Sequence, residues 1–233
     1  MQFKNDFILA CQDYYYLLNK GYAVKSSLKI VGDRYELSSI ERNILLRGIS
    51  QNKKIEERKA KTILENQIEN KKVHIDGYNL LFTISNYYNG DFCFISLDGF
   101  VRDCANIGGR NKKRLNYEKT TSILLLFLIE LKPQKCLIYF DEPVSKSKED
   151  IELFKILLSN NKDFSYSKDL FDLLLVRNPD TVLSKINSDE IIVTSDSVII
   201  DKTDSRIFDI FRWYFNRNKI RLFSLEDFLV FNH

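Results

Sequence analysis

Three aspartates stand at the ends of short apolar runs in this sequence. Asp76 closes "VHID", Asp141 closes "CLIYFD", and Asp196 lies just past the apolar residues of "IIVTSD". In open α/β sheets ligands bind outside the carboxyl ends of the strands, so parallel neighbouring strands would bring these carboxylates to one edge. Converging carboxylates repel one another, and a hard divalent cation relieves that repulsion. The pattern predicts that Asp76, Asp141 and Asp196 are catalytic residues that hold Mg²⁺ or Mn²⁺.

Helix capping is the alternative explanation for each of these aspartates. Aspartate is a preferred N-cap residue, and the turn from a strand to a helix is where such caps belong. For any one of the three, capping is the more ordinary role, and the recurrence at three strand ends is what supports a shared site. The sequence alone leaves both explanations open.

Two further aspartates are candidates for the metal shell. Asp103, in the motif "LDGFVRD", would be an additional acidic ligand, and an exposed ion pair is its ordinary alternative. Asp201 follows Asp196 by five residues and would face the same cleft if the intervening segment turned sharply. The pair Asp98-Gly99 in the same motif as Asp103 is typical of a turn.

Polar and basic residues near these motifs are candidates for substrate contact. Asn79 would orient the first carboxylate or contact a phosphate, and its alternative role is to initiate a helix. The glycine-led loop "GGRNKKR" fits a clamp on a phosphate backbone, although solvated loop charges are the ordinary alternative. The expected substrate-binding residues are Asn79, Arg102, Arg110, Lys112, Lys113, Arg114 and Ser195.

Several classes of function are disfavoured by what the sequence contains. There are only two histidines, His74 and His233, which argues against a histidine base or a histidine-ligated zinc site. Neither a GK[ST] phosphate loop nor a G-x-G-x-x-G motif after a strand occurs, so nucleotide-cofactor enzymes are poor candidates. The four cysteines have no paired spacing and are expected to be reduced packing residues. No apolar run is long enough to span a bilayer or to form a signal peptide, so we expect a cytoplasmic protein without a membrane partner.

The elements that must position these residues change in character near residue 71. Residues 1–71 are predicted to be helical throughout, because apolar residues recur at intervals of three and four and Ser38 and Glu41 have capping-box spacing. Residues 72–233 alternate short β-rich runs with amphipathic ones, which is typical of a mainly parallel sheet in an α/β domain. The predicted strands are 73–76, 136–141, 171–176, 190–194 and 220–224, and the predicted helices are 117–132, 148–160, 204–218 and a short one from Leu225.

The charge along the chain is uneven. Residues 1–72 carry 14 Lys/Arg and 9 Asp/Glu, whereas residues 73–233 carry 21 and 23. A basic helical module beside a slightly acidic one favours a protein that holds a polyanion on the first and coordinates cations on the second, although surface charge also serves plain solubility.

The motifs resemble those of a known family pair. The stretch from Asp13 through "YLLNKGYAVKSSLKIVGDRYELSSIERNILLRGIS" resembles the helical module of the prokaryotic family known as domain of unknown function 434. The motifs "IDGYNLLFTI", "LDGFVRD", "YFDEPVSKSKED" and "VTSDSVIID" resemble its usual partner, a PIN-like domain. This chain departs from the family pattern after "PVS". The family tends to have an asparagine and a glycine there, whereas this chain has Lys146 and Lys148 on either side of Ser147.

This resemblance implies a fold and an activity. PIN-like domains are three-layer sandwiches of helices around a parallel sheet, and their active members are ribonucleases that use acidic residues with Mg²⁺ or Mn²⁺. By resemblance, Asp76 would be the ligand at the first strand, Asp141 the central acidic residue and Asp196 the late one, with Asp103 and Asp201 as supplements.

We therefore expect a divalent-metal-dependent nuclease that hydrolyses RNA phosphodiesters, with the basic helical module assisting binding. Two alternatives remain open: a non-catalytic RNA-binding protein that retains the fold, and a phosphatase that acts on small phosphoesters. A homodimer is compatible with the sequence.

Overall fold

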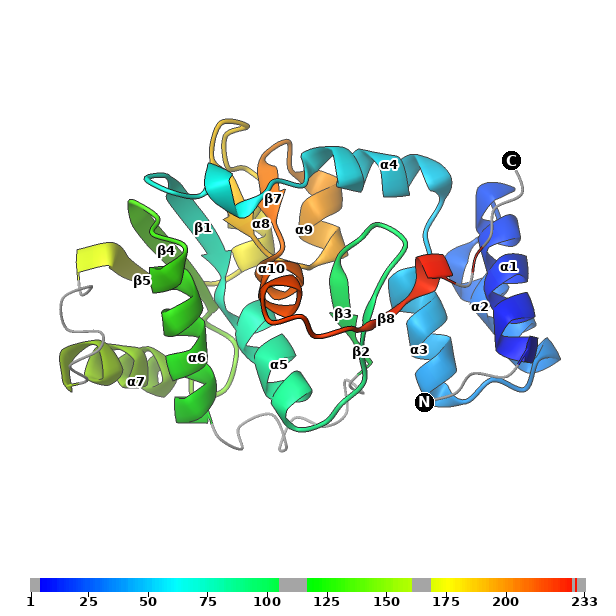
Figure 1. Ribbon diagram of the computed structural model, residues 1–233, viewed down its shortest axis with the longest axis horizontal. Coiled ribbons are helices and arrows are strands. Elements are labelled where there is room, and N and C mark those ends of the chain that lie inside the picture. The colour runs from blue at the N-terminus through cyan, green and yellow to red at the C-terminus, as the bar shows by residue number, and fades with distance from the viewer. Residues whose placement is uncertain (1–4, 105–116, 161–168, 228, 230–233) are drawn as a thin grey trace. The chain divides into compact units, whose positions relative to one another are not determined.

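The computed structural model describes residues 5–104, 117–160, 169–227 and 229 (Figure 1). The chain divides into two compact units, and each is discontinuous in sequence. We call Met1–Ala60, Asp91–Ala105 and Arg221–His233 the helical unit, and Lys61–Gly90 and Asn106–Ile220 the sheet unit. This division differs from the predicted single boundary near residue 71, because two later segments belong with the first helices.

The helical unit contains the predicted N-terminal helices. They are α1 (Asn5–Asn19), α2 (Val24–Arg34), α3 (Ser39–Gly48) and α4 (Asn52–Lys61), of which only the last residue belongs to the sheet unit. The prediction of helix throughout residues 1–71 is wrong after Lys61, where Thr62 forms a β-bridge and only a 3₁₀ turn follows. The predicted capping box is confirmed at the start of α3: the Glu41 amide donates to Ser38 Oγ at 3.3 Å, and the Ser38 amide donates to Glu41 Oε2 at 2.8 Å.

A small sheet completes the core of the helical unit. Its strands are β2 (Cys93–Ile95), β3 (Val101–Asp103) and β8 (Phe223–Ser224), in the order β3-β2-β8. The predicted turn between β2 and β3 is confirmed, with Gly99 in the left-handed region at φ 85°. The strand predicted at 220–224 differs from β8 in two respects. The strand β8 has only two residues, and it belongs to this small sheet rather than to the parallel sheet of the α/β domain. A short 3₁₀ turn, η4 (Leu225–Asp227), follows it.

Ion pairs in the helical unit balance the basic charge of the first helices. Over residues 5–60, 91–104 and 221–229 the sequence has equal numbers of Lys/Arg and Asp/Glu, twelve of each. The pairs include Arg47 with Asp103 at 2.9 Å, Arg58 with Asp98 at 2.8 Å, and Lys59 with Glu226 at 2.7 Å. Over these segments of the unit, the excess of basic residues counted along residues 1–72 is therefore absent.

The sheet unit is built on five parallel strands. They are β1 (Lys72–Asp76), β4 (Lys135–Asp141), β5 (Phe171–Val176), β6 (Ile191–Val193) and β7 (Arg206–Phe208), in the order β5-β4-β1-β6-β7. The predicted mainly parallel sheet is confirmed. The prediction of a helix over 204–218 is wrong in its first part, because the short run "RIF" forms edge strand β7 and Asp209 caps the helix that follows.

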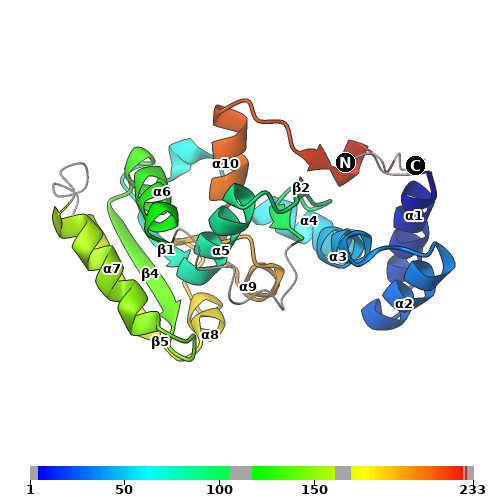
Figure 2. The same ribbon diagram turned by 90° about the horizontal axis from the view of Figure 1, so that it is seen from below.

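Helices follow each strand of the sheet unit. They are α5 (Gly77–Tyr88), α6 (Tyr117–Glu130), α7 (Ser147–Asn160), α8 (Pro179–Leu183), α9 (Ser197–Lys202) and α10 (Ile210–Arg217), with a 3₁₀ turn η1 (Glu65–Gln67) before β1. Figure 1 shows α5, α6 and α7 in a row, and in Figure 2 α7 lies along β4 and β5. Aromatic rings join three helices, because Tyr87 of α5 packs on Phe215 of α10, and Phe127 of α6 packs on Trp213.

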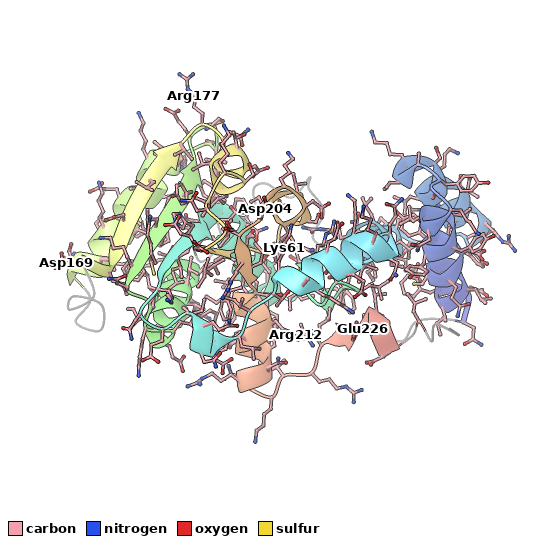
Figure 3. All side chains as sticks on the ribbon, turned by 90° about the horizontal axis from the view of Figure 1, so that it is seen from above. Lys61, Asp169, Arg177, Asp204, Arg212 and Glu226 are labelled. Carbon is pink, nitrogen blue, oxygen red and sulfur yellow. The ribbon has the colours of Figure 1, made fainter. Side chains whose placement is uncertain are left out.

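Two local contacts fix the ends of helices in the sheet unit. Lys61, labelled in Figure 3, donates from Nζ to the carbonyl oxygens of Ile200 at 2.8 Å and Thr203 at 2.6 Å, which satisfies the end of α9. Gly77 begins α5 close to β4, and a Cβ atom there would lie 2.8 Å from the carbonyl oxygen of Tyr139. A glycine directly behind Asp76 therefore lets α5 approach the sheet.

Among the described residues, no helix has both the length and the apolar character needed to cross a membrane.

Candidate active site

A cavity of about 250 Å³ lies at the carboxyl ends of the parallel strands in the sheet unit. Four aspartates line it: Asp76, Asp141, Asp180 and Asp196. They follow β1, β4, β5 and β6, which are neighbours in the sheet. The strand order runs outward from β1 in both directions, so the cavity lies where the order reverses, the usual ligand position in open α/β sheets. The structure thus brings together the three predicted catalytic aspartates.

Asp76 is the most buried of the four carboxylates. Its side chain accepts a hydrogen bond from Thr194 Oγ1 at 3.1 Å and a long one from the Asn79 amide at 3.4 Å. Burial, reinforced by the negative charge of Asp196, raises the pKa of Asp76 to about 7. A carboxylate held in this way is destabilised when it is ionised, and a nearby cation would remove the penalty.

Asp141 ends β4 without capping a helix. The next helix, α7, begins six residues later at Ser147. Its Oδ1 atom is buried and accepts no hydrogen bond from the described part of the chain, and burial raises the pKa of this carboxyl. An unpartnered buried carboxylate oxygen is costly, and this oxygen remains available to a ligand.

Asp180 lines the cavity but is not among the predicted site residues. It lies in the first turn of α8, but Asn178 is the cap, since its Oδ1 accepts from the Thr181 amide at 2.9 Å. Burial, followed by the charge of Asp196, raises the pKa of Asp180. The signal was present in "RNPD", because the Asn-Pro turn carries the carboxylate four residues past the end of the predicted strand.

Asp196 does cap a helix. Its Oδ1 accepts from the Val198 amide at 2.7 Å at the start of α9. The capping alternative therefore describes Asp196 well and Asp76 weakly, and it does not describe Asp141 or Asp180. Capping alone cannot explain why four carboxylates line one cavity.

Asn79 joins the cavity to the end of β6. Its Oδ1 accepts from the Ser195 amide at 3.1 Å and from Ser195 Oγ at 3.2 Å. Asn79 lines the cavity, whereas Ser195 is buried behind it and is not among the lining residues. Thr194, from the same segment, was not predicted as a site residue and donates a hydrogen bond to Asp76.

Several predicted site residues do not line the cavity. Asp103 and Arg102 lie on β3 of the helical unit; Asp103 pairs with Arg47, and Arg102, 5% exposed, pairs with Asp98 at 3.1 Å. A guanidinium buried against a carboxylate is not presented to a phosphate in this arrangement. Asp201 is exposed on α9 and is absent from the cavity lining. The basic loop residues Arg110, Lys112, Lys113 and Arg114 lie outside the described residues.

The chemistry of the lining fits a hard divalent cation. It offers carboxylate and amide oxygens, which Mg²⁺ and Mn²⁺ prefer, and it contains no lysine or arginine in the part of the chain that the structure describes. Although the carboxylates share one cavity, within the described ranges no three acidic, histidine or cysteine side chains are close enough to hold a metal ion. The donor set is therefore present without a preassembled cage.

The raised pKa of Asp76 predicts a pH dependence of stability in the absence of metal. A carboxyl whose pKa rises from 3.8 to about 7 keeps its proton in the folded state while the unfolded chain has lost it. Stability should thus fall as the pH rises from about 4 to 7, by up to about 4 kcal/mol. Urea unfolding in EDTA across this range would measure it, with Asp76→Asn as the control that flattens the slope. Equal slopes for the two proteins would contradict the prediction.

Comparison with known proteins gives the family of the chain. Over 138 residues it is 32% identical to an uncharacterised protein of Methanocaldococcus jannaschii, which is 59% of this chain and 66% of the relative. No solved structure matches the chain. Residues 6–61 match the family described as "Protein of unknown function (DUF434)", which confirms the resemblance of the N-terminal stretch. Residues 65–213, more than half of the chain, match the "Domain of unknown function (DUF5616)", and the chain belongs to that family.

Proposed function

We propose that this protein is a Mg²⁺- or Mn²⁺-dependent nuclease that hydrolyses RNA phosphodiesters, and that its sheet unit is a PIN-like domain. The observation that carries the proposal is the set of four carboxylates from four neighbouring strand ends lining one cavity without a basic residue in its described lining. The parallel sheet with helices after each strand supports the PIN-like assignment.

Electrostatics explains why such a cavity would take a cation. The pKa values of Asp76, Asp141 and Asp180 are all raised, with burial as the first cause of each. Keeping these groups ionised near neutral pH costs free energy that a divalent ion would return. An ion at such a site supplies a Lewis acid and a water of lowered pKa for attack on phosphorus.

The chain's own residues prepare the site for this role. Thr194 and the start of α5 fix the orientation of Asp76, and Asn79 is fixed in turn by Ser195. Asp141 presents an oxygen that no described group occupies. Fixed acidic groups at the ends of rigid strands would hold a metal ion in a defined position, and the ion would orient the phosphodiester.

The first test is cleavage of end-labelled RNA with Mg²⁺, Mn²⁺ or EDTA. We expect cleavage with either ion and none in EDTA, restored when the ion is added back. Single-stranded RNA, structured RNA and DNA in parallel would identify the polymer. Salt-sensitive binding that is unaffected by EDTA, with no cleavage under any condition, would reject the nuclease in favour of a binding protein. Hydrolysis of sugar phosphates with intact polymers would reject it in favour of a phosphatase.

A further inference from the structure

Aromatic side chains form a second wall of the same cavity. Tyr78, Phe82 and Tyr139 line it together with the carboxylates, and we call these three the aromatic wall. We propose that the aromatic wall binds a single unpaired nucleobase of the substrate. This inference rests on the proposed nuclease function and deepens it, because it names the group that is recognised beside the phosphate.

The hydroxyl of Tyr78 is tied to a partner inside the fold. It donates to Asp150 Oδ2 at 2.8 Å, and both residues are buried. Its ring stands edge-on to Phe140, with ring centroids 5.4 Å apart, which fixes the plane of the ring. What Tyr78 offers at the cavity is therefore its ring, since its polar atom is engaged elsewhere.

The hydroxyl of Tyr139 is tied back in a similar way. Tyr139 is the register partner of Asp76 on the neighbouring strand, so its side chain projects from the same face of the sheet. Its Oη lies 2.9 Å from His74 Nδ1, and the two rings are stacked with centroids 5.8 Å apart. His74 Nε2 in turn lies 3.3 Å from Glu190 Oε2, and Glu190 pairs with Lys72 at 2.9 Å. His74 thus contacts the Tyr139 ring and its hydroxyl directly, and Glu190 and Lys72 lie behind His74.

Phe82 extends the aromatic wall outward. Its ring is stacked on that of Tyr78, with an interplanar angle of 14° and centroids 5.4 Å apart. Phe82 is half-buried, whereas Tyr78 and Tyr139 are each 6% exposed. An ordered aromatic stack with a partly exposed outer ring is the kind of surface on which bases stack in proteins that bind single-stranded nucleic acids.

The position and size of the cavity favour a base over other ligands. A sugar phosphate would reach the carboxylates only through a bound cation, and it carries no flat ring that could stack on the aromatic wall. The cavity, at about 250 Å³, is smaller than the roughly 300–1,000 Å³ of pockets for drug-sized ligands. A cavity of this size fits one flat ring better than a base pair, so we infer that the base that enters is unpaired.

Calorimetric titration with adenosine 5′-monophosphate and ribose 5-phosphate in Mg²⁺ tests this inference. Stacking predicts that the nucleotide binds about 5- to 100-fold more tightly than the sugar phosphate. Phe82→Leu should remove most of that difference and leave the affinity for ribose 5-phosphate unchanged. Tyr139→Phe, which keeps the ring, should retain the difference in affinity between the two ligands. Phe223→Leu, a half-buried ring on β8 outside the cavity lining, is the matched control and should change neither affinity.

Equal affinities for the two ligands, or no binding of the nucleotide, would overturn the aromatic wall as a base site. A Phe82→Leu variant that weakens both ligands equally would overturn it too, because the defect would then be general damage to the cavity. The affinities measured by calorimetry are independent of the RNA cleavage that tests the nuclease. Uncut RNA with a preserved preference for the nucleotide would reject only the nuclease, and cleavage with equal affinities would reject only the aromatic wall.

Discussion

Asp141→Asn should lower RNA cleavage by at least about 100-fold while leaving the stability of the protein unchanged or slightly higher. Asp141 caps no helix, and its buried Oδ1 accepts no hydrogen bond from the described residues, so no native contact within them is lost. Burial already raises the pKa of this carboxyl, and a neutral amide of the same shape relieves that penalty. The two effects are measured by initial cleavage rates in Mn²⁺ and by the midpoint of urea unfolding in EDTA.

A control carboxylate lies on the adjacent strand. Asp172 of β5 pairs with Lys135 at 2.8 Å and is not among the cavity residues, so Asp172→Asn should change the cleavage rate less than about twofold. The interpretation of Asp141 as a metal ligand would be abandoned if its variant unfolded like a core mutant, or if it cut RNA at the rate of the control.

Asp98→Ala should destabilise the helical unit by about 3–5 kcal/mol. Asp98 is 4% exposed and accepts from Arg58 at 2.8 Å and from Arg102 at 3.1 Å. Burial pushes its pKa upward, but Arg102, Ser96 and Arg58 together hold the pKa below its usual value. Removing this carboxylate would leave two buried guanidinium groups without their shared counter-charge. Guanidinium unfolding followed by circular dichroism measures the loss.

Two companion variants make the Asp98 result interpretable. Glu226→Ala removes the exposed partner of Lys59 and should cost no more than about 1 kcal/mol. Asp98→Asn keeps the shape and an acceptor oxygen while removing the charge, so its stability should lie between those of the alanine variant and the wild type. If Asp98→Ala cost no more than Glu226→Ala, the buried ion cluster would not stabilise this unit.

The strand-end aspartates could be found from the sequence because their signal is local. Asp76, Asp141 and Asp196 each follow a short apolar run, and parallel pairing then brings such ends together whatever the details of packing. Asp180 escaped because its carboxylate is displaced from the strand end by a turn. The strand β7 was not predicted, because its three residues are too few to show the alternation of buried and exposed side chains that marks a strand.

The motif "LDGFVRD" shows what a local signal cannot decide. It has the acidic and basic residues of a site, yet Arg102 is neutralised by Asp98, and Asp103 by Arg47, which is far away in sequence. Whether a charged side chain is available to a ligand depends on the partners that folding brings to it from other segments of the chain. For the same reason, the basic count of residues 1–72 did not predict the charge balance of the helical unit.

The discontinuity of the helical unit has a consequence for the order in which the protein can be completed during synthesis. Its first four helices leave the ribosome early, but their core also contains Phe94 and Leu225, and Leu225 is fully buried. The unit therefore cannot close until more than two hundred residues have been translated. We expect the early helices to remain an incompletely packed intermediate, which makes the helical unit the part of the molecule most dependent on chaperones.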